Sequence, residues 1–222
     1  MQEQQLIMFI IKCIIDKYCK TKDGKVYACF VDFQKAFDTI IHTGIKIKLL
    51  SIGVGSKFYE IIKNMYEVGK SCVKLQNHIL VTGHFPINLG VKQGDNLSPN
   101  LFKIFINDLP DYIEDSIDLI LLNNKPLNCL LYADDLVLFS TSAKGLQTRL
   151  DKLQKYCKDW CLKVNPNTTK VLVFNKAGRH IQEKFIYENK ILDVLLIINI
   201  LDCISAHQAR SSLLKQNCTK KH

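Results

Sequence analysis

The sequence lacks the cysteine pattern of a zinc site. No C-x-x-C pair occurs among its nine cysteines, and the closest two, Cys157 and Cys161, have no second pair of ligands nearby. Their spacing of one helical turn predicts two small core residues on one face of a helix. Because the cysteine count is odd and no cleavable signal segment opens the sequence, we expect reduced thiols in an intracellular protein, whether nuclear or cytoplasmic.

No apolar run in the sequence is long enough for a transmembrane helix. The most apolar late segment, residues 191–204, contains Asp193, Asn199 and Asp202 and falls short of the roughly 20 residues that span a bilayer. We therefore expect neither a membrane anchor nor a membrane partner. The sequence also has no internal repeat, which argues against a solenoid.

The composition is that of a globular, basic protein. Apolar residues make up 47% of the 222, which is enough to bury a core. Thirty Lys and Arg residues against 21 Asp and Glu give a net charge of +9, which suits a partner with a regular negative charge such as a nucleic acid backbone. Charge alone does not identify that partner, because many basic domains bind no nucleic acid.

Helix and strand patterns alternate along the chain. Apolar residues at helical spacing predict helices over residues 6–18, 58–66, 99–109 and 146–161. The third of these begins with Ser98 as N-cap and Pro99 as first helical residue, and Pro110 ends it. Apolar and β-branched runs predict strands over residues 26–33, 71–75, 79–82, 127–132, 136–140 and 171–174. Strands and helices mixed on one sheet predict an α+β domain.

Two adjacent aspartates separate two of the predicted strands. Asp134 and Asp135 lie between the apolar runs 127–132 and 136–140, the pattern of a buried hairpin with its charges at the tip. An isolated D-D pair is usually a solvated turn. Two carboxylates about 4 Å apart, however, repel by roughly 4 kcal/mol at an effective dielectric near 20, and apolar surroundings add a desolvation cost to each ion. Such a pair is stabilised when a cation lies between the two charges. Asp32, at the end of an earlier apolar strand, offers a third carboxylate, so the sequence predicts a site for Mg2+ ions.

Five segments of the sequence carry a resemblance to a known family. They are F-V-D-F-Q-K-A-F-D (residues 30–38), G-V-K-Q-G-D-N-L-S-P-N-L-F (90–102), N-D-L-P (107–110), L-Y-A-D-D (131–135) and L-K-V-N-P-N-T-T-K (162–170). In this order they resemble the reverse transcriptases of non-LTR (LINE-type) retrotransposons, over about residues 6–175.

The resemblance implies the palm of an RNA-directed DNA polymerase. Its fold would be an antiparallel sheet backed by helices, with partial fingers and an absent or degenerate thumb. Its reaction would be two-metal transfer of deoxynucleotides onto a primer 3′-hydroxyl, with two Mg2+ ions, or Mn2+ in their place. The implied partners are an RNA template, a DNA primer and deoxynucleoside triphosphates, whereas no oligomeric state is indicated.

The resemblance also assigns catalytic roles to individual residues. It makes Asp32, Asp134 and Asp135 the catalytic metal ligands. It makes Lys170 a catalytic lysine that assists the departing pyrophosphate, a task suited to a flexible ammonium group. The alternative for Lys170 is an ordinary basic residue at the start of a strand.

Three further residues match positions that bind the nucleotide in the family. Phe37 matches the aromatic gate that excludes a 2′-hydroxyl, and its alternative is a core phenylalanine in the turn after the strand. Gln93 and Gly94 match the loop that packs against the incoming nucleotide and template, where glycine lets the backbone approach closely. For this loop the alternative is a plain turn.

By the same resemblance the chain divides into three parts. Residues 1–24 would be a helix from the junction of fingers and palm, 25–176 the reverse transcriptase palm, and 177–222 a degenerate palm end with primer grip and thumb start. The family has fingers strands before residue 6, and a Tyr-Leu-Gly segment and helical thumb after residue 175, so we expect a truncated copy. Two alternatives stay open: an inactive remnant with at most non-specific nucleic acid binding, and an intron maturase-like protein.

Overall fold

A computed structural model describes residues 2–20, 24–72, 85–92, 94–114, 118–175 and 182–197 of the chain. The described residues form two compact units. Unit 1 lies within Met1–Asp32, Ile113–Gln154 and Asn165–His222, and unit 2 lies within Phe33–Tyr112 and Lys155–Val164. No helix in the described ranges has the length and apolar character needed to cross a membrane.

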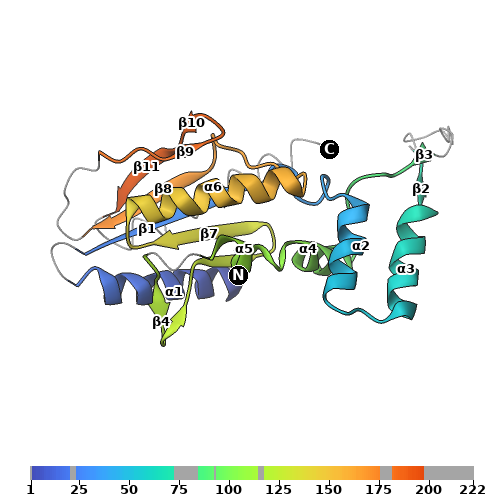
Figure 1. Ribbon diagram of the computed structural model, residues 1–222, viewed down its shortest axis with the longest axis horizontal. Coiled ribbons are helices and arrows are strands. Elements are labelled where there is room, and N and C mark those ends of the chain that lie inside the picture. The colour runs from blue at the N-terminus through green and yellow to red at the C-terminus, as the bar shows by residue number, and fades with distance from the viewer. Residues whose placement is uncertain are drawn as a thin grey trace. The chain divides into compact units, whose positions relative to one another are not determined.

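Unit 1 is built on a five-stranded sheet (Figure 1). Its strands, in spatial order, are β11 (Asp193–Ile197), β8 (Lys170–Asn175), β1 (Lys25–Asp32), β7 (Asp135–Ser140) and β6 (Cys129–Tyr132). The ladders from β8 to β6 are antiparallel, whereas the edge strand β11 runs parallel to β8. The predicted α+β class with an antiparallel sheet is therefore confirmed, with one parallel strand added at its edge.

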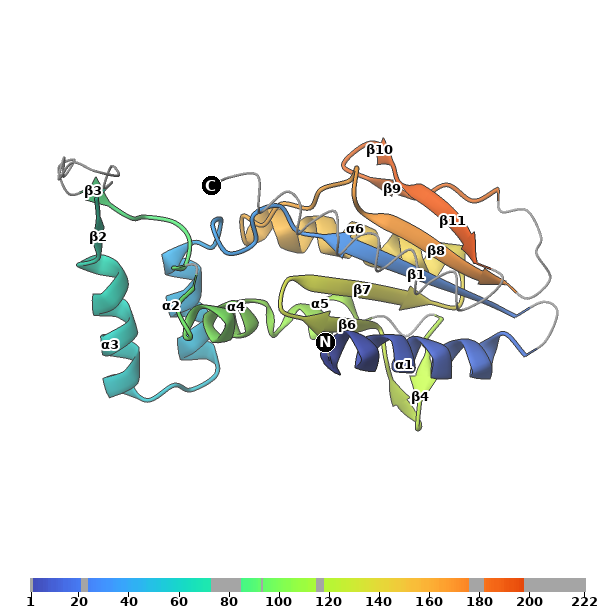
Figure 2. The same ribbon diagram turned by 180° about the vertical axis from the view of Figure 1, so that it is seen from behind.

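Helices cover both faces of this sheet. The face of β1 that carries Val26, Ala28 and Phe30 packs in one apolar cluster with α1 (Gln2–Tyr18). Figures 1 and 2 show α6 (Ala143–Asp159) along the opposite side of the sheet. All six inner residues of β1 are buried, as expected of a strand covered on both faces.

Two short hairpins belong to the described part of unit 1. Their strands are β4 (Leu121–Leu122), β5 (Lys125–Pro126), β9 (Ile186–Tyr187) and β10 (Lys190–Ile191). Each hairpin turns on two residues with positive φ, the geometry of a type I′ turn. Asparagine, which tolerates positive φ, occupies three of these four turn positions.

Unit 2 is mainly helical. Its elements are α2 (His42–Ser51), α3 (Ser56–Glu67), α4 (Ser98–Ile106) and a pair of short strands, β2 (Lys70–Ser71) and β3 (Phe85–Pro86). The short helix α5 (Leu109–Ile113) follows α4. Gly44 allows α2 to lie close to α4, because a Cβ at this position would be 2.6 Å from the ring of Phe105.

The predicted start of α4 is wrong by one residue. Leu97 is the N-cap and Ser98 is already helical. The Ser98 hydroxyl donates to the carbonyl oxygen of Lys92 at 2.6 Å and does not cap the helix. A hydrogen bond to the preceding loop has therefore replaced the capping interaction.

Two other local predictions also fail. Pro110 does not stop a helix: α4 already ends at Ile106, and Pro110 lies in the first turn of α5, where proline is tolerated. Cys161 is exposed beyond the end of α6, with φ of +57°, so it does not share a buried face with Cys157. The predicted strands 71–75 and 79–82 lie, apart from residues 71 and 72, outside the described residues.

Candidate active site

The hairpin of β6 and β7 carries the adjacent aspartates at its tip. Tyr132 pairs with Asp135, which leaves Ala133 and Asp134 as a two-residue loop. Ala133 has φ of +49°, a left-handed conformation that residues with a side chain adopt infrequently and that is often found at functional sites. Asp134 is exposed in this turn.

Asp32 lies directly opposite Asp135 in the antiparallel ladder of β1 and β7. Opposed residues of such a ladder project from the same face of the sheet, with Cα atoms about 4.5–5.5 Å apart. On the other side of β1, Phe30 is opposite Lys170. Strand pairing thus places Asp32, Asp135 and Lys170 on one face, although they come from three separate motifs.

The three aspartates are neighbours along the backbone, but their side chains do not gather into a three-ligand group. In the ranges that the structure describes, no three His, Cys, Asp or Glu side chains are close enough together to hold a metal ion. The donor chemistry does fit, because carboxylate oxygens are the ligands that Mg2+ prefers in proteins. The assignment of Asp32, Asp134 and Asp135 as metal ligands stays a prediction.

A turn before β8 contacts Asp32 through three hydrogen bonds. The N–H of Asn165 donates to the carbonyl oxygen of Asp32 at 2.7 Å, and the N–H of Asp32 donates to Thr169 Oγ1 at 3.2 Å. The Thr168 hydroxyl donates to Asp32 Oδ2 at 2.5 Å. Sequence reasoning missed both threonines, although they lie in the motif that ends at Lys170.

Lys170 is the first residue of β8 and half exposed. Its Nζ lies 3.6 Å from Asp193 Oδ2, and the register of β8 and β11 places these two residues side by side. The structure therefore shows an ion pair at this lysine and leaves its catalytic role as a prediction.

The segment around Phe37 is paired with the start of the glycine-rich loop. The N–H of Val91 donates to the carbonyl oxygen of Phe37, and that of Gly90 donates to the carbonyl oxygen of Ile40, both at 2.8 Å. The half-buried ring of Phe37 packs against Phe102, with 5.1 Å between ring centroids. This contact is compatible with both a core residue and a nucleotide gate.

Of the two predicted loop residues that bind nucleotide, only Gly94 is described. Gln93 lies outside the described residues. Gly94 is exposed, has φ of +85°, and has no heavy atom within 4 Å of the position a Cβ would take. The backbone here is accessible to an approaching molecule, as the prediction for Gly94 requires.

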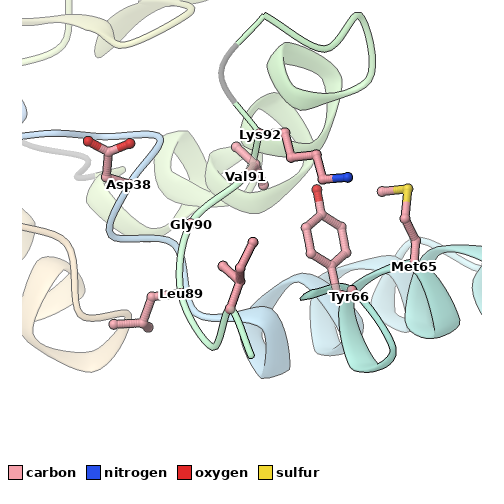
Figure 3. A pocket seen from close by; sticks show the side chains of 9 residues that line it. Asp38, Met65, Tyr66, Leu89, Gly90, Val91 and Lys92 are labelled. Atoms are coloured by element: carbon pink, nitrogen blue, oxygen red, sulfur yellow. The ribbon is translucent and has the colours of Figure 1, made fainter. Parts of the chain in front are cut away.

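A cavity of about 230 Å3 lies beside this loop. Tyr66 and Met65, from α3, line it together with the loop residues Val91 and Lys92, and Figure 3 shows the Lys92 side chain extending toward Tyr66. Burial, and secondly the charge of Asp95, raise the pKa of Tyr66. The wall of the cavity thus carries a tyrosine and a lysine.

Comparison with known proteins decides the family. The model of the family described as reverse transcriptase (RNA-dependent DNA polymerase) matches residues 1–208. The chain belongs to the reverse transcriptase family. This family consists of nucleotidyltransferases, so the enzyme class predicted from the motifs is confirmed at the level of the family.

The curated relatives of this reverse transcriptase are proteins of retrotransposons. It is 32% identical over 181 residues to the probable RNA-directed DNA polymerase from transposon BS of Drosophila melanogaster, covering 76% of this chain and 18% of the relative. It is 32% identical over 155 residues to the Pol polyprotein of the retrotransposable element R2DM of the same organism, covering 68% of this chain and 14% of the relative. The predicted resemblance to non-LTR retrotransposons is confirmed, and the chain spans less than a fifth of either relative.

Solved telomerases share the fold of this reverse transcriptase. The structure of apo telomerase from Candida tropicalis, truncated from its C-terminal domain, superposes with a TM-score of 0.59 at 15% identity, covering 86% of this chain and 38% of that one. A telomerase from the same organism, in complex with a fragment of telomeric RNA, gives a TM-score of 0.58 at 14% identity, covering 76% and 29%. The polymerase palm fold expected from the motifs is thereby confirmed.

Proposed function

We propose that this chain is the catalytic palm of an RNA-directed DNA polymerase, which adds deoxynucleotides to a primer 3′-hydroxyl on an RNA template. The observation that carries the proposal is the strand register in which Asp32 faces Asp135, with Asp134 adjacent in the hairpin turn. The relatives named as polymerases of mobile elements, and the related fold of a telomerase solved with RNA, support a nucleic acid substrate.

Asp32, Asp134 and Asp135 would hold the divalent ions, which we take to be Mg2+ with Mn2+ as a substitute. Such ions, when bound, lower the pKa of the attacking hydroxyl and neutralise charge on the leaving pyrophosphate. The protein's part is to hold the three carboxylates at the ends of adjacent strands. Lys170, on the same face as Asp32, would leave Asp193 and then either donate a proton to the pyrophosphate or stabilise its negative charge.

The incoming deoxynucleotide would lie against Phe37 and the loop of Gln93 and Gly94. Two backbone hydrogen bonds support this part of the proposal, because they hold the two proposed nucleotide-binding segments next to each other. One joins Val91 to Phe37, and the other joins Gly90 to Ile40. The ring of Phe37 would then exclude a 2′-hydroxyl by its bulk. Gly94, which has no side chain, would let the nucleotide approach the backbone closely.

The test is a chimera, because the chain spans only 18% of the BS relative. In it, this chain replaces the matching segment of the BS polymerase, and extension of a DNA primer on an RNA template is measured with Mg2+. We expect the chimera to extend the primer and Asp134→Asn to lower the rate by about 100-fold or more, because an amide is a poor metal ligand. Asp159→Asn, at an exposed aspartate near the end of α6, is the matched control and should leave the rate unchanged.

Each result decides between the proposal and its alternatives. Full activity of the Asp134→Asn chimera would contradict the assignment of the metal site. A folded chimera without activity, next to an active parent polymerase, would instead support an inactive remnant.

A further inference from the structure

The turn that precedes β8 forms hydrogen bonds with three groups of Asp32. Its hydrogen bonds reach the carbonyl oxygen, the amide and one carboxylate oxygen of this single residue. The turn itself is braced, because the N–H groups of Thr168 and Thr169 both donate to the carbonyl oxygen of Asn165, at 3.3 and 3.0 Å. Asn165 Oδ1 also accepts from the N–H of Asn167 at 3.2 Å. Asp32 is thus held by a preformed loop.

The two threonines act on different parts of Asp32. Thr169 is fully buried, and its hydroxyl oxygen accepts the backbone N–H, so it holds the main chain at the end of β1. Thr168 is exposed, and its hydroxyl reaches the carboxylate itself. Thr168 is therefore the residue that can set the orientation of the side chain.

The Thr168 hydroxyl has a second acceptor nearby. It lies 3.4 Å from the carbonyl oxygen of Asn165 and 2.5 Å from Asp32 Oδ2. A hydroxyl has one proton, and a hydrogen bond to an ionised carboxylate is shorter and stronger than one to a neutral carbonyl. The proton therefore points to Asp32.

We propose that Thr168 is a positioning residue, which holds the Asp32 carboxylate in one orientation at the candidate metal site. The inference rests on the proposed function, because it takes Asp32 as a metal ligand. A carboxylate has two oxygens and about four acceptor sites, so Oδ2 can accept from Thr168 while the group also binds an ion. Hydrogen bonds of this kind to metal-binding carboxylates typically change metal affinity or activity by about 10–100-fold when removed.

The experiment measures Mn2+ binding to the whole 222-residue chain by the loss of the electron paramagnetic resonance signal of the free ion. Thr168→Val removes the hydroxyl and keeps the shape, and Thr168→Ser keeps the hydroxyl. The matched control is Thr148→Val, since the Thr148 hydroxyl donates within its own helix, to the carbonyl oxygen of Lys144. Urea unfolding of every variant shows whether the fold is retained.

We expect Thr168→Val to weaken Mn2+ binding by about 10-fold or more and Thr168→Ser to bind within about twofold of the parent chain. In the polymerase chimera, the Thr168→Val variant should need more Mg2+ for half-maximal rate and reach nearly the same rate at saturation. A purely structural role would not raise the Mg2+ concentration needed for half-maximal rate while leaving the rate at saturation nearly unchanged.

Asp32→Asn separates failure of this inference from failure of the proposed function. If Asp32→Asn loses the Mn2+ site and Thr168→Val binds as the parent does, the role of Thr168 is disproved and the metal site stands. If Asp32→Asn itself binds Mn2+ normally, the metal site is misassigned and both proposals fall.

Discussion

Lys48 is a buried cation in the core of unit 2. It forms an ion pair with Asp108, and its Nζ lies 3.6 Å from the ring centroid of Trp160. The Tyr156 hydroxyl donates to the other oxygen of Asp108 at 2.7 Å. Burial of an ammonium group is costly unless it is paired, and here a carboxylate and an aromatic face both stabilise it.

Lys48→Met should therefore destabilise the protein by about 1–2 kcal/mol. The variant keeps the apolar stem and loses the cation–π contact and the ion pair. The ion pair contributes less to stability than a fully buried one would, because Asp108 is half exposed. Urea unfolding provides the measurement. Lys46→Met, on the same helix, removes a surface ion pair with Glu67 and should cost no more than about 0.5 kcal/mol. Equal losses of stability for the two variants would show that the buried Lys48 contributes no more than a surface lysine.

Tyr27 links stability to alkaline pH. Burial, and then the charge and hydrogen bond of Glu183, raise the pKa of Tyr27 to about 12. A tyrosine in the unfolded chain has a pKa of about 10. Between these values the unfolded state releases a proton that the folded state keeps, so the free energy of unfolding falls as the pH rises.

Tyr27→Phe should make this fall shallower, because the substituted residue no longer titrates. The measurement is urea unfolding at several values between about pH 9 and 12. Part of the fall will persist, because burial and the hydrogen bond to Asp108 also raise the pKa of Tyr156. An unchanged pH dependence in Tyr27→Phe would show that Tyr27 is not protected in the folded protein.

At the scale of the element, the glycine-rich loop is held against the turn after β1. Gly90 has φ of +83°, and a Cβ there would lie 2.9 Å from the carbonyl oxygen of Asp38 and 3.1 Å from that of Phe37. His42 Nε2, at the start of α2, lies 2.8 Å from the carbonyl oxygen of Gly90. The close approach of two backbones explains why glycine is required.

Gly90→Ala should thus cost more stability than Gly94→Ala. Both substitutions put a side chain on a left-handed residue, which costs roughly 1–2 kcal/mol. Only Gly90 adds a backbone clash, because the surroundings of Gly94 are open. In urea unfolding we expect Gly90→Ala to lower the free energy of unfolding by more than about 2 kcal/mol and Gly94→Ala to lower it by about 1 kcal/mol. Equal costs would mean that the loop does not pack on the turn as described.

At the scale of the whole molecule, the net charge of +9 predicts how the proposed binding of nucleic acid should depend on salt. Contacts from lysine and arginine to phosphates release counterions, so affinity for single-stranded RNA should fall by about 10-fold or more between 50 and 200 mM salt. Affinity should vary little among unrelated sequences, because phosphates carry no base information. Filter binding measures both quantities, and an affinity that is flat over this range of salt would exclude a phosphate-contacting surface.

Local pattern was a good guide to the elements and a poor guide to their ends. The apolar run before Asp32 predicted a buried strand, and β1 is buried along its whole interior. The capping signal at Ser98 misled because its hydroxyl donates to the Lys92 carbonyl oxygen in the preceding loop. The stop signal at Pro110 misled because proline is also tolerated in the first turn of a helix. The apolar run that contains β11 was considered only as a membrane segment, and its parallel pairing with β8 depends on tertiary structure that no local pattern encodes.

The sequence by itself determined the family and the acidic residues of the candidate site, because these depend on residue types at set spacings in an ordered series of motifs. Only the tertiary structure decided that Asp32 faces Asp135 and that Thr168, not Thr169, reaches the Asp32 carboxylate. Thr168 and Thr169 are identical residues at adjacent positions, so the sequence alone does not show which of them contacts the carboxylate. Strand register and the path of the turn determine which hydroxyl meets the carboxylate, and both result from packing between segments far apart in the chain.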